Sequence, residues 1–161
     1  MSIHTPTQPS PSTPSGLIPP VVVWLGYGGL LPFLALAAVG LWAPSTPWWS
    51  AALLAYGAVI LSFVGALHWG FAMAQSGLCT AERTRCFVWS VVPSLLAWPA
   101  VLLPPAIGAA LLIAGFVAHL IQDHWLAART AMPGWYLPLR WRLTATACLC
   151  LAVGAAATVA H

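Results

Sequence analysis

The sequence predicts an all-α integral membrane protein, a single-domain bundle of about five transmembrane helices. Of its 161 residues, 61% are hydrophobic and only 4% are charged, and the mean hydropathy is +0.90. Such a composition leaves too little polar surface to face water all round. Apolar runs of about 20 residues, the length needed to cross a bilayer, recur along the chain. The five arginines lie between these runs.

The N-terminal residues 1–19 are rich in Ser, Thr and Pro. They bury too little apolar surface to offset the entropy of ordering, so we expect a disordered tail. The tail contains no Lys or Arg, so we do not expect a cleaved signal peptide. The first span is predicted at residues 21–41, with a kink near Pro32. The second and longest is predicted at residues 48–74.

The remaining spans are predicted at residues 86–103, 106–126 and 143–160. A charged loop, residues 75–85, leads into the third span, which Pro93 and Pro99 should bend. A minimal Pro-Pro turn separates the third span from the fourth. The longest connection precedes the fifth span. We find no repeat of 20 to 50 residues and no inverted-repeat symmetry that would indicate a transporter.

The arginines predict the orientation. All five fall in the connections after the second and fourth spans, and positive residues near span ends are retained in the cytoplasm. We therefore expect a cytoplasmic N-terminus and a C-terminus outside, or the equivalent sides in an organelle. Tryptophan prefers the membrane interface. The tryptophans predicted at the outer interface are Trp42, Trp48, Trp49 and Trp98, and those predicted at the cytoplasmic interface are Trp24, Trp69, Trp89, Trp125, Trp135 and Trp141.

A layer of polar residues is predicted near the cytoplasmic side. Counting 1.5 Å per residue, His68 and His119 both lie roughly 10 Å deep, and Ser90 and Tyr27 fall in about the same layer. Asp123 follows His119 by four residues, so both share a helical face. One interpretation is a ligand site for a quinone head group, a transition metal, a haem or a migrating proton, with Asp123 orienting an imidazole.

The alternative interpretation is structural. Each imidazole would then make a hydrogen bond between packed helices, and Asp123 would pair with Arg83, Arg85 or Arg129. Such contacts stabilise membrane bundles by about 1 kcal/mol each. The sequence leaves both interpretations open, and it leaves any cofactor unknown.

Small residues recur at helical spacing, from Ala66 to Gly70 and at Ala152, Ala156 and Ala160. We expect them to pack helices together within the chain, with a dimer or a larger partner as the alternative use of the second series. The four cysteines are expected to be reduced thiols. With only two carboxylates in the chain and none of the common hydrolase or nucleotide motifs, an enzyme is the weakest interpretation.

Four ordered motifs carry a family resemblance. They are Leu25-Gly26-Tyr27-Gly28-Gly29-Leu30-Leu31-Pro32-Phe33, then Tyr56 to Phe63 leading to His68-Trp69-Gly70, then Trp89-Ser90-Val91-Val92-Pro93-Ser94, and Trp135-Tyr136-Leu137-x-Leu139-Arg140. Together they resemble the transmembrane protein 69-like family, a bacterial domain of unknown function with a mitochondrial inner-membrane relative. The resemblance implies a multi-span fold and a bacterial inner-membrane or mitochondrial-type location, of which we expect the bacterial inner membrane, and it supplies no activity. The motif positions with an expected structural role are Gly26, Pro32, Ser62, Trp69, Gly70, Pro93 and Ser94.

Two functions follow as expectations. The first is a non-enzymatic accessory, assembly or scaffold protein of a larger membrane complex, possibly a respiratory or other energy-conserving one. The second is a bundle that binds or transports a quinone, a metal or a proton through His68, His119 and Asp123. The chain is expected to interact with the bilayer and possibly with another membrane protein or a second copy of itself. Nucleic acid is not an expected partner, because the arginines form no basic face.

Overall fold

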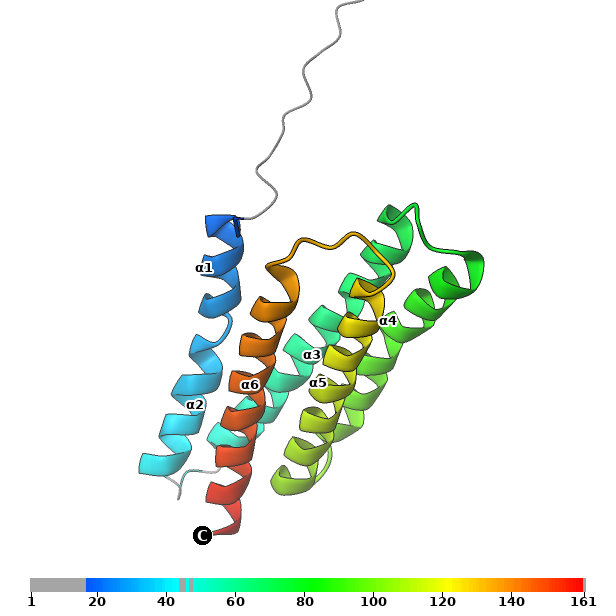
Figure 1. Ribbon diagram of the computed structural model, residues 1–161. Coiled ribbons are helices and arrows are strands. Elements are labelled where there is room, and N and C mark those ends of the chain that lie inside the picture. The colour runs from blue at the N-terminus through cyan, green and yellow to red at the C-terminus, as the bar shows by residue number, and fades with distance from the viewer. Residues whose placement is uncertain (1–16, 44–45, 47, 161) are drawn as a thin grey trace, which may run out of the picture.

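The computed structural model describes residues 17–43, 46 and 48–160, which are helical apart from short connections. The predicted tail therefore lies almost entirely outside the described residues. The helices run up and down in one bundle (Figure 1). They are α1 (Pro20–Gly28), α2 (Leu31–Trp42), α3 (Trp48–Ala74), α4 (Thr80–Ala100), α5 (Pro105–Ala127) and α6 (Tyr136–Val159).

The predicted all-α membrane bundle is confirmed. Four stretches of the described chain are long and apolar enough to cross a membrane: Pro20–Trp42, Trp48–Ala74, Pro105–Ala127 and Tyr136–Val159. The first of these comprises α1 and α2 together. Helix α4 has 21 residues and is long enough to cross, but it lies outside this set because its first two turns carry Glu82, Arg83 and Arg85.

The first span is broken rather than merely kinked. Helix α1 ends at Gly28, and α2 begins at Leu31 with Pro32 in its first turn. Proline lacks a backbone N–H, so it cannot continue the hydrogen-bond ladder across the break. The hydroxyl of Tyr56 on α3 donates to the Gly29 carbonyl at 2.8 Å. A side chain of the neighbouring helix thus forms a hydrogen bond with a backbone carbonyl at the helix break.

Two predicted helix starts were wrong. Helix α4 begins at Thr80, six residues before the predicted third span, and α6 begins at Tyr136, seven residues before the predicted fifth span. In both cases the arginines that we assigned to loops lie in the first turns of a helix. At the start of α4, Glu82 accepts a hydrogen bond from the Cys79 backbone N–H at 3.0 Å, which caps the helix.

Helix α3 lies at the centre and packs against α2, α4, α5 and α6. It approaches α4 closely at Gly65, where an added Cβ would lie 2.8 Å from the Pro93 ring. The predicted packing of Ala66 and Gly70 was wrong, since both are exposed. A Cβ on Gly70 would meet no atom within 4 Å.

The small residues of α6, Ala152, Ala156 and Ala160, are also exposed, so they do not pack within this chain. Trp49 departs from its expected place as well. Instead of lying at an interface it is 2% exposed and packs where glycines leave room: a Cβ on Gly40 would lie 2.7 Å from its ring.

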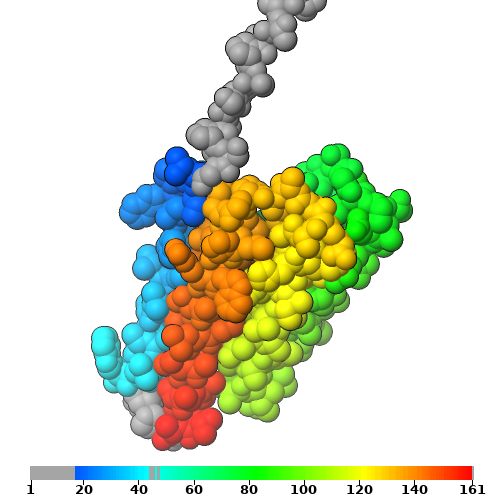
Figure 2. Space-filling view, in the orientation of Figure 1, coloured from blue at the N-terminus to red at the C-terminus, as the bar shows by residue number. Residues whose placement is uncertain are grey.

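One end of the bundle carries all five arginines, and we call it the arginine end. The start of α1, the ends of α3 and α5 and the starts of α4 and α6 meet there, while the C-terminus of α6 lies at the opposite end (Figure 1). On the face shown in Figure 2, α6 lies between the α1 and α2 segment and α5. The connection from α5 to α6 crosses the arginine end.

Candidate functional site

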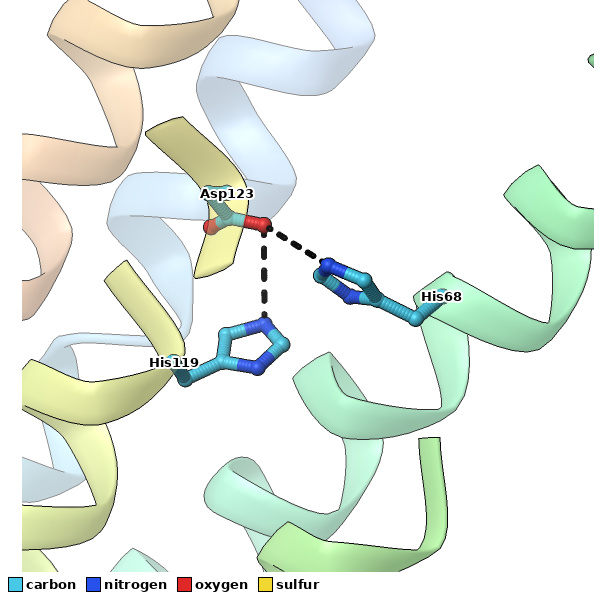
Figure 3. Close-up of side chains that lie close together, drawn as sticks. All are labelled: His68, His119 and Asp123. Carbon is cyan, nitrogen blue, oxygen red and sulfur yellow. Dashed lines mark ion pairs between the residues drawn. The ribbon is translucent and has the colours of Figure 1, made fainter. Parts of the chain in front are cut away.

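Two helices bring three of the predicted site residues together. His68 projects from α3, and His119 and Asp123 project from α5 (Figure 3). The imidazole centroids lie 4.8 Å apart. The Nε2 atoms of His68 and His119 lie 3.8 and 3.7 Å from Asp123 Oδ1. All three residues are fully buried, so the structure answers whether the two histidines face one another: they do.

Helix α6 supplies the charge that balances Asp123. Arg140 Nε donates to Asp123 Oδ2 at 2.7 Å, and the hydroxyl of Tyr136 donates to Oδ1 at 3.1 Å. Tyr136 and Arg140 are four residues apart, so they share one face of the first turns of α6. The expected partners of Asp123, namely Arg83, Arg85 and Arg129, were therefore wrong. The sum of the formal charges of Asp123 and Arg140 is zero.

Trp89 fixes the tautomer of His119. Its indole Nε1 lies 3.0 Å from His119 Nδ1, and an indole N–H can only donate. The Nδ1 atom must then accept, so a neutral His119 carries its hydrogen on Nε2, the atom that faces Asp123. Trp89 is thus a site residue rather than the interfacial anchor that its position predicted.

The buried polar atoms around Asp123 are not all paired. Among the described residues, both ring nitrogens of His68, Nε2 of His119 and Nη2 of Arg140 have no hydrogen-bond partner. Unpaired buried polar atoms are rare, because each costs about 1–3 kcal/mol. Four of the six unpaired buried side-chain atoms of the described residues belong to His68, His119 and Arg140, which makes this cluster the candidate site.

The cluster has the spacing of a metal site but not the charge of one. His68, His119 and Asp123 offer ligand atoms within 4.8 Å of one another. A metal ion with ligands at about 2.1 Å holds those atoms roughly 3.4 Å apart. A divalent ion would add two positive charges to a buried pair that already sums to zero, which is costly inside a membrane. In addition, the Nε2 atom of His119 that faces the cluster carries a hydrogen, so it has no lone pair to offer a metal ion.

The other two predicted site residues lie apart from this cluster. Ser90 is buried, and its hydroxyl donates to the Phe87 carbonyl within α4 at 2.7 Å. Tyr27 is exposed, and its hydroxyl accepts from Arg142 at 3.4 Å. The sequence predicted that both residues share one ligand site with the histidines and Asp123, whereas the hydrogen bonds of their hydroxyls go to Phe87 and Arg142.

Four residues of the cluster escaped the sequence prediction: Tyr136, Arg140, Trp89 and Gln122. Gln122 is buried, and its side-chain oxygen accepts from Arg85 at 2.8 Å. Arg85 in turn lies 3.9 Å above the ring of Trp125. The available signal was the i, i+4 spacing of Tyr136 and Arg140. It was hidden because both residues were placed in a loop.

A groove of about 600 Å³ reaches the cluster from the side. Its walls come mainly from α1, α2, α3 and α6, with Phe116 of α5 and part of the α5–α6 connection. Its lining includes Leu25 and Phe63, which are 74% and 62% exposed. The groove therefore opens on the surface that the spans present to lipid. The wall is mostly aliphatic and aromatic, with polar side chains of Gln75, Tyr136, Arg140 and Thr144. None of His68, His119, Asp123, Ser90 or Tyr27 lines it.

Fold and cluster define a multi-pass helical membrane protein with a buried polar centre at one end of its bundle. Residues 18–156 match the family model described as "Protein of unknown function (DUF3429)". The chain is 36% identical over 135 residues to transmembrane protein 69 of Xenopus tropicalis, an alignment that covers 80% of this chain and 51% of that relative. The chain thus spans about half the length of this curated relative.

The chain belongs to this family and is similar to transmembrane protein 69, so the resemblance seen in its motifs is confirmed. No solved structure matches it. The family description names no reaction, so the site geometry has to carry any functional argument.

Proposed function

We propose that this protein binds an amphipathic membrane molecule in the lateral groove, with the polar head group against Arg140 and the apolar part among the side chains of α1, α3 and α6. The observation that carries the proposal is a charged side chain, the guanidinium of Arg140, in the wall of an apolar groove. Arg140 is only 7% exposed, it lines the groove, and Asp123 holds it through Nε.

The shape of the groove supports a ligand of moderate size. Pockets that bind small molecules span about 300–1,000 Å³ and are mostly apolar with a few placed polar groups. This groove, at about 600 Å³, has that size and that composition. A membrane ligand can enter it sideways from the bilayer, because the exposed side chains of Leu25 and Phe63 form part of its lining.

The buried cluster acts in this proposal through Arg140 and Tyr136. Asp123 holds both side chains by hydrogen bonds, and His68 and His119 close the opposite side of the carboxylate. The histidines are sealed from the groove, so they position the residues that touch the ligand. This differs from the direct contact expected from the sequence.

The experiment uses a substitution that fills the groove. Leu67 of α3 is half-buried and lines the groove, whereas Leu95 of α4 is 63% exposed and does not line it. We expect native mass spectrometry of the full chain in mild detergent to show a bound lipid-like mass in the wild type and in Leu95→Trp, and about tenfold less of it in Leu67→Trp. Equal occupancy in both variants would contradict the proposal.

The accessory or scaffold function remains a second proposal. The observation that favours it is the exposed row Ala152, Ala156 and Ala160 on α6, since small residues allow close helix approach in membranes. The same native spectra test it. A second membrane protein or a second copy of this chain that Ala156→Leu releases would support it, and a monomer without any protein partner would not.

We also propose the bacterial inner membrane as the location, with the arginine end in the cytoplasm. The arginine distribution supports this orientation, and the family resemblance supports the location. Reporter fusions on the two sides of the membrane test the orientation.

A further inference from the structure

We infer that the head group held at Arg140 is the ring of an isoprenoid-type quinone in its oxidised, carbonyl-bearing form. This inference rests on the proposed groove function and names its ligand class. It follows from the charge of the subsite, from the hydrogen-bonding capacity there and from the composition of the wall.

Charge comes first. Arg140 is the only arginine among the groove-lining residues, and its positive charge is already paired with Asp123, with Nε 2.7 Å from Oδ2. A phosphate or carboxylate head group would therefore bring an uncompensated negative charge to the end of an apolar groove, which costs several kcal/mol. A neutral head group avoids that cost.

Hydrogen-bonding capacity narrows the choice to an acceptor. Arginine has donors and no acceptor, and the guanidinium of Arg140 lines the groove. The Tyr136 hydroxyl already donates its hydrogen to Asp123. A carbonyl oxygen is a head-group atom that accepts from this guanidinium. A head group that only donates cannot form a hydrogen bond with the guanidinium.

The wall near Arg140 suits a flat ring. Phe71 and Tyr136 both line the groove and meet edge to face, with centroids 5.9 Å apart. Aromatic faces and edges stabilise a planar partner beyond simple burial. The rest of the wall, including Leu67 and Leu143, is aliphatic and fits an isoprenoid tail that continues into the bilayer.

The test compares two probes that share a ten-carbon tail and differ in charge: decylubiquinone and decyl phosphate. Each is titrated into the full chain in mild detergent, and bound mass is counted by native mass spectrometry. We expect decylubiquinone to bind about tenfold or more tightly than decyl phosphate. We also expect Leu67→Trp, but not Leu95→Trp, to weaken the binding of decylubiquinone about tenfold.

A substitution at the charge pair supplies the second arm. Asp123→Asn keeps the shape and an acceptor for Arg140 Nε but removes the negative charge. The subsite then carries a net positive charge, so the preference should shift toward decyl phosphate by about tenfold or more. A thermal unfolding scan establishes that the variant is folded. Should it not fold, the comparison of the two probes on the wild type and the two leucine variants decides the inference alone.

The outcomes separate the two proposals. A wild type that prefers decyl phosphate, with binding lost in Leu67→Trp, would overturn the quinone inference and leave the groove as a binding site. Binding of neither probe, or binding of both that Leu67→Trp does not change, would overturn the quinone inference and the groove function together. An unchanged preference in a folded Asp123→Asn would refute the charge argument and with it the inference.

Discussion

At Asp123, three helices depend on one carboxylate. His68 of α3 faces it, and Arg140 and Tyr136 of α6 bind it. A buried charge pair is weak evidence for net stability, but removal of one partner leaves the other charge buried alone. We therefore expect Asp123→Ala to lower the free energy of unfolding by about 3–5 kcal/mol.

A double variant tests this account of Asp123. Asp123→Ala with Arg140→Met removes both charges, so it should destabilise the protein less than Asp123→Ala alone. The measurement is denaturant or thermal unfolding in detergent. The control is Arg129→Gln, which breaks the more exposed Arg129–Glu82 pair and should cost about 1 kcal/mol or less. A double variant that is the least stable of the set would contradict the charge argument.

The tautomer of His119 gives a second prediction at this scale. Trp89→Phe removes the donor to Nδ1, so the preference for the Nε2–H form should be lost, and stability should fall by about 1 kcal/mol. Nitrogen-15 NMR of histidine-labelled protein distinguishes the two ring forms. Trp98→Phe, an exposed tryptophan of the same helix, is the control. A wild type that already shows Nδ1–H on His119 would refute the assignment.

Sequence reasoning reached part of the cluster. The matched depth of His68 and His119 and the i, i+4 spacing to Asp123 could be read from helix geometry alone, and the three residues do meet. Arg140 could not be found in this way. Hydropathy placed the start of the last span at the first long apolar run, whereas the α6 backbone already turns helical at Tyr136, among polar residues that side-chain partners from α5 stabilise.

Among the elements, α3 and α4 give the sharpest packing prediction. At Gly65 an added methyl group would lie 2.8 Å from the Pro93 ring, which is buried and has few ways to move. We expect Gly65→Ala to lower the unfolding free energy by about 1–3 kcal/mol. Gly70→Ala on the same helix has open space and should be neutral or slightly stabilising. The measurement is the unfolding midpoint of each variant. Equal midpoints would contradict the prediction and would mean that α4 shifts to accommodate the added methyl group.

The sequence was sufficient to predict which segments are helical, but it was not sufficient to predict where each helix begins and ends. Apolar runs of about 20 residues located the helices, because a bilayer demands that length. The break between α1 and α2 was expected only as a kink, since nothing in the local sequence reveals that Tyr56, on another helix, satisfies Gly29. The use of small residues was also mispredicted. Gly65 meets a proline from α4, a contact that spacing within one helix does not encode.

For the whole molecule, the orientation is the property to measure. With the arginine end in the cytoplasm, the C-terminus lies outside. We expect a reporter that is active only outside the cytoplasm to function when fused after the last residue, and a reporter that is active only in the cytoplasm to fail there. A fusion after Arg129 is the internal control and should behave in the opposite way. The reverse pattern would show that the arginines do not set the topology.

Helix α4 has a consequence for how the protein is made. Its neighbours in sequence are apolar enough to enter a bilayer independently, whereas α4 begins with a glutamate and two arginines. The insertion machinery sorts each segment by its own free energy of transfer into the bilayer. By that criterion α4 alone would insert poorly. We expect α4 to insert as a hairpin with α3, its most extensive packing partner. The order of synthesis, in which α3 emerges first, then becomes a condition for correct assembly.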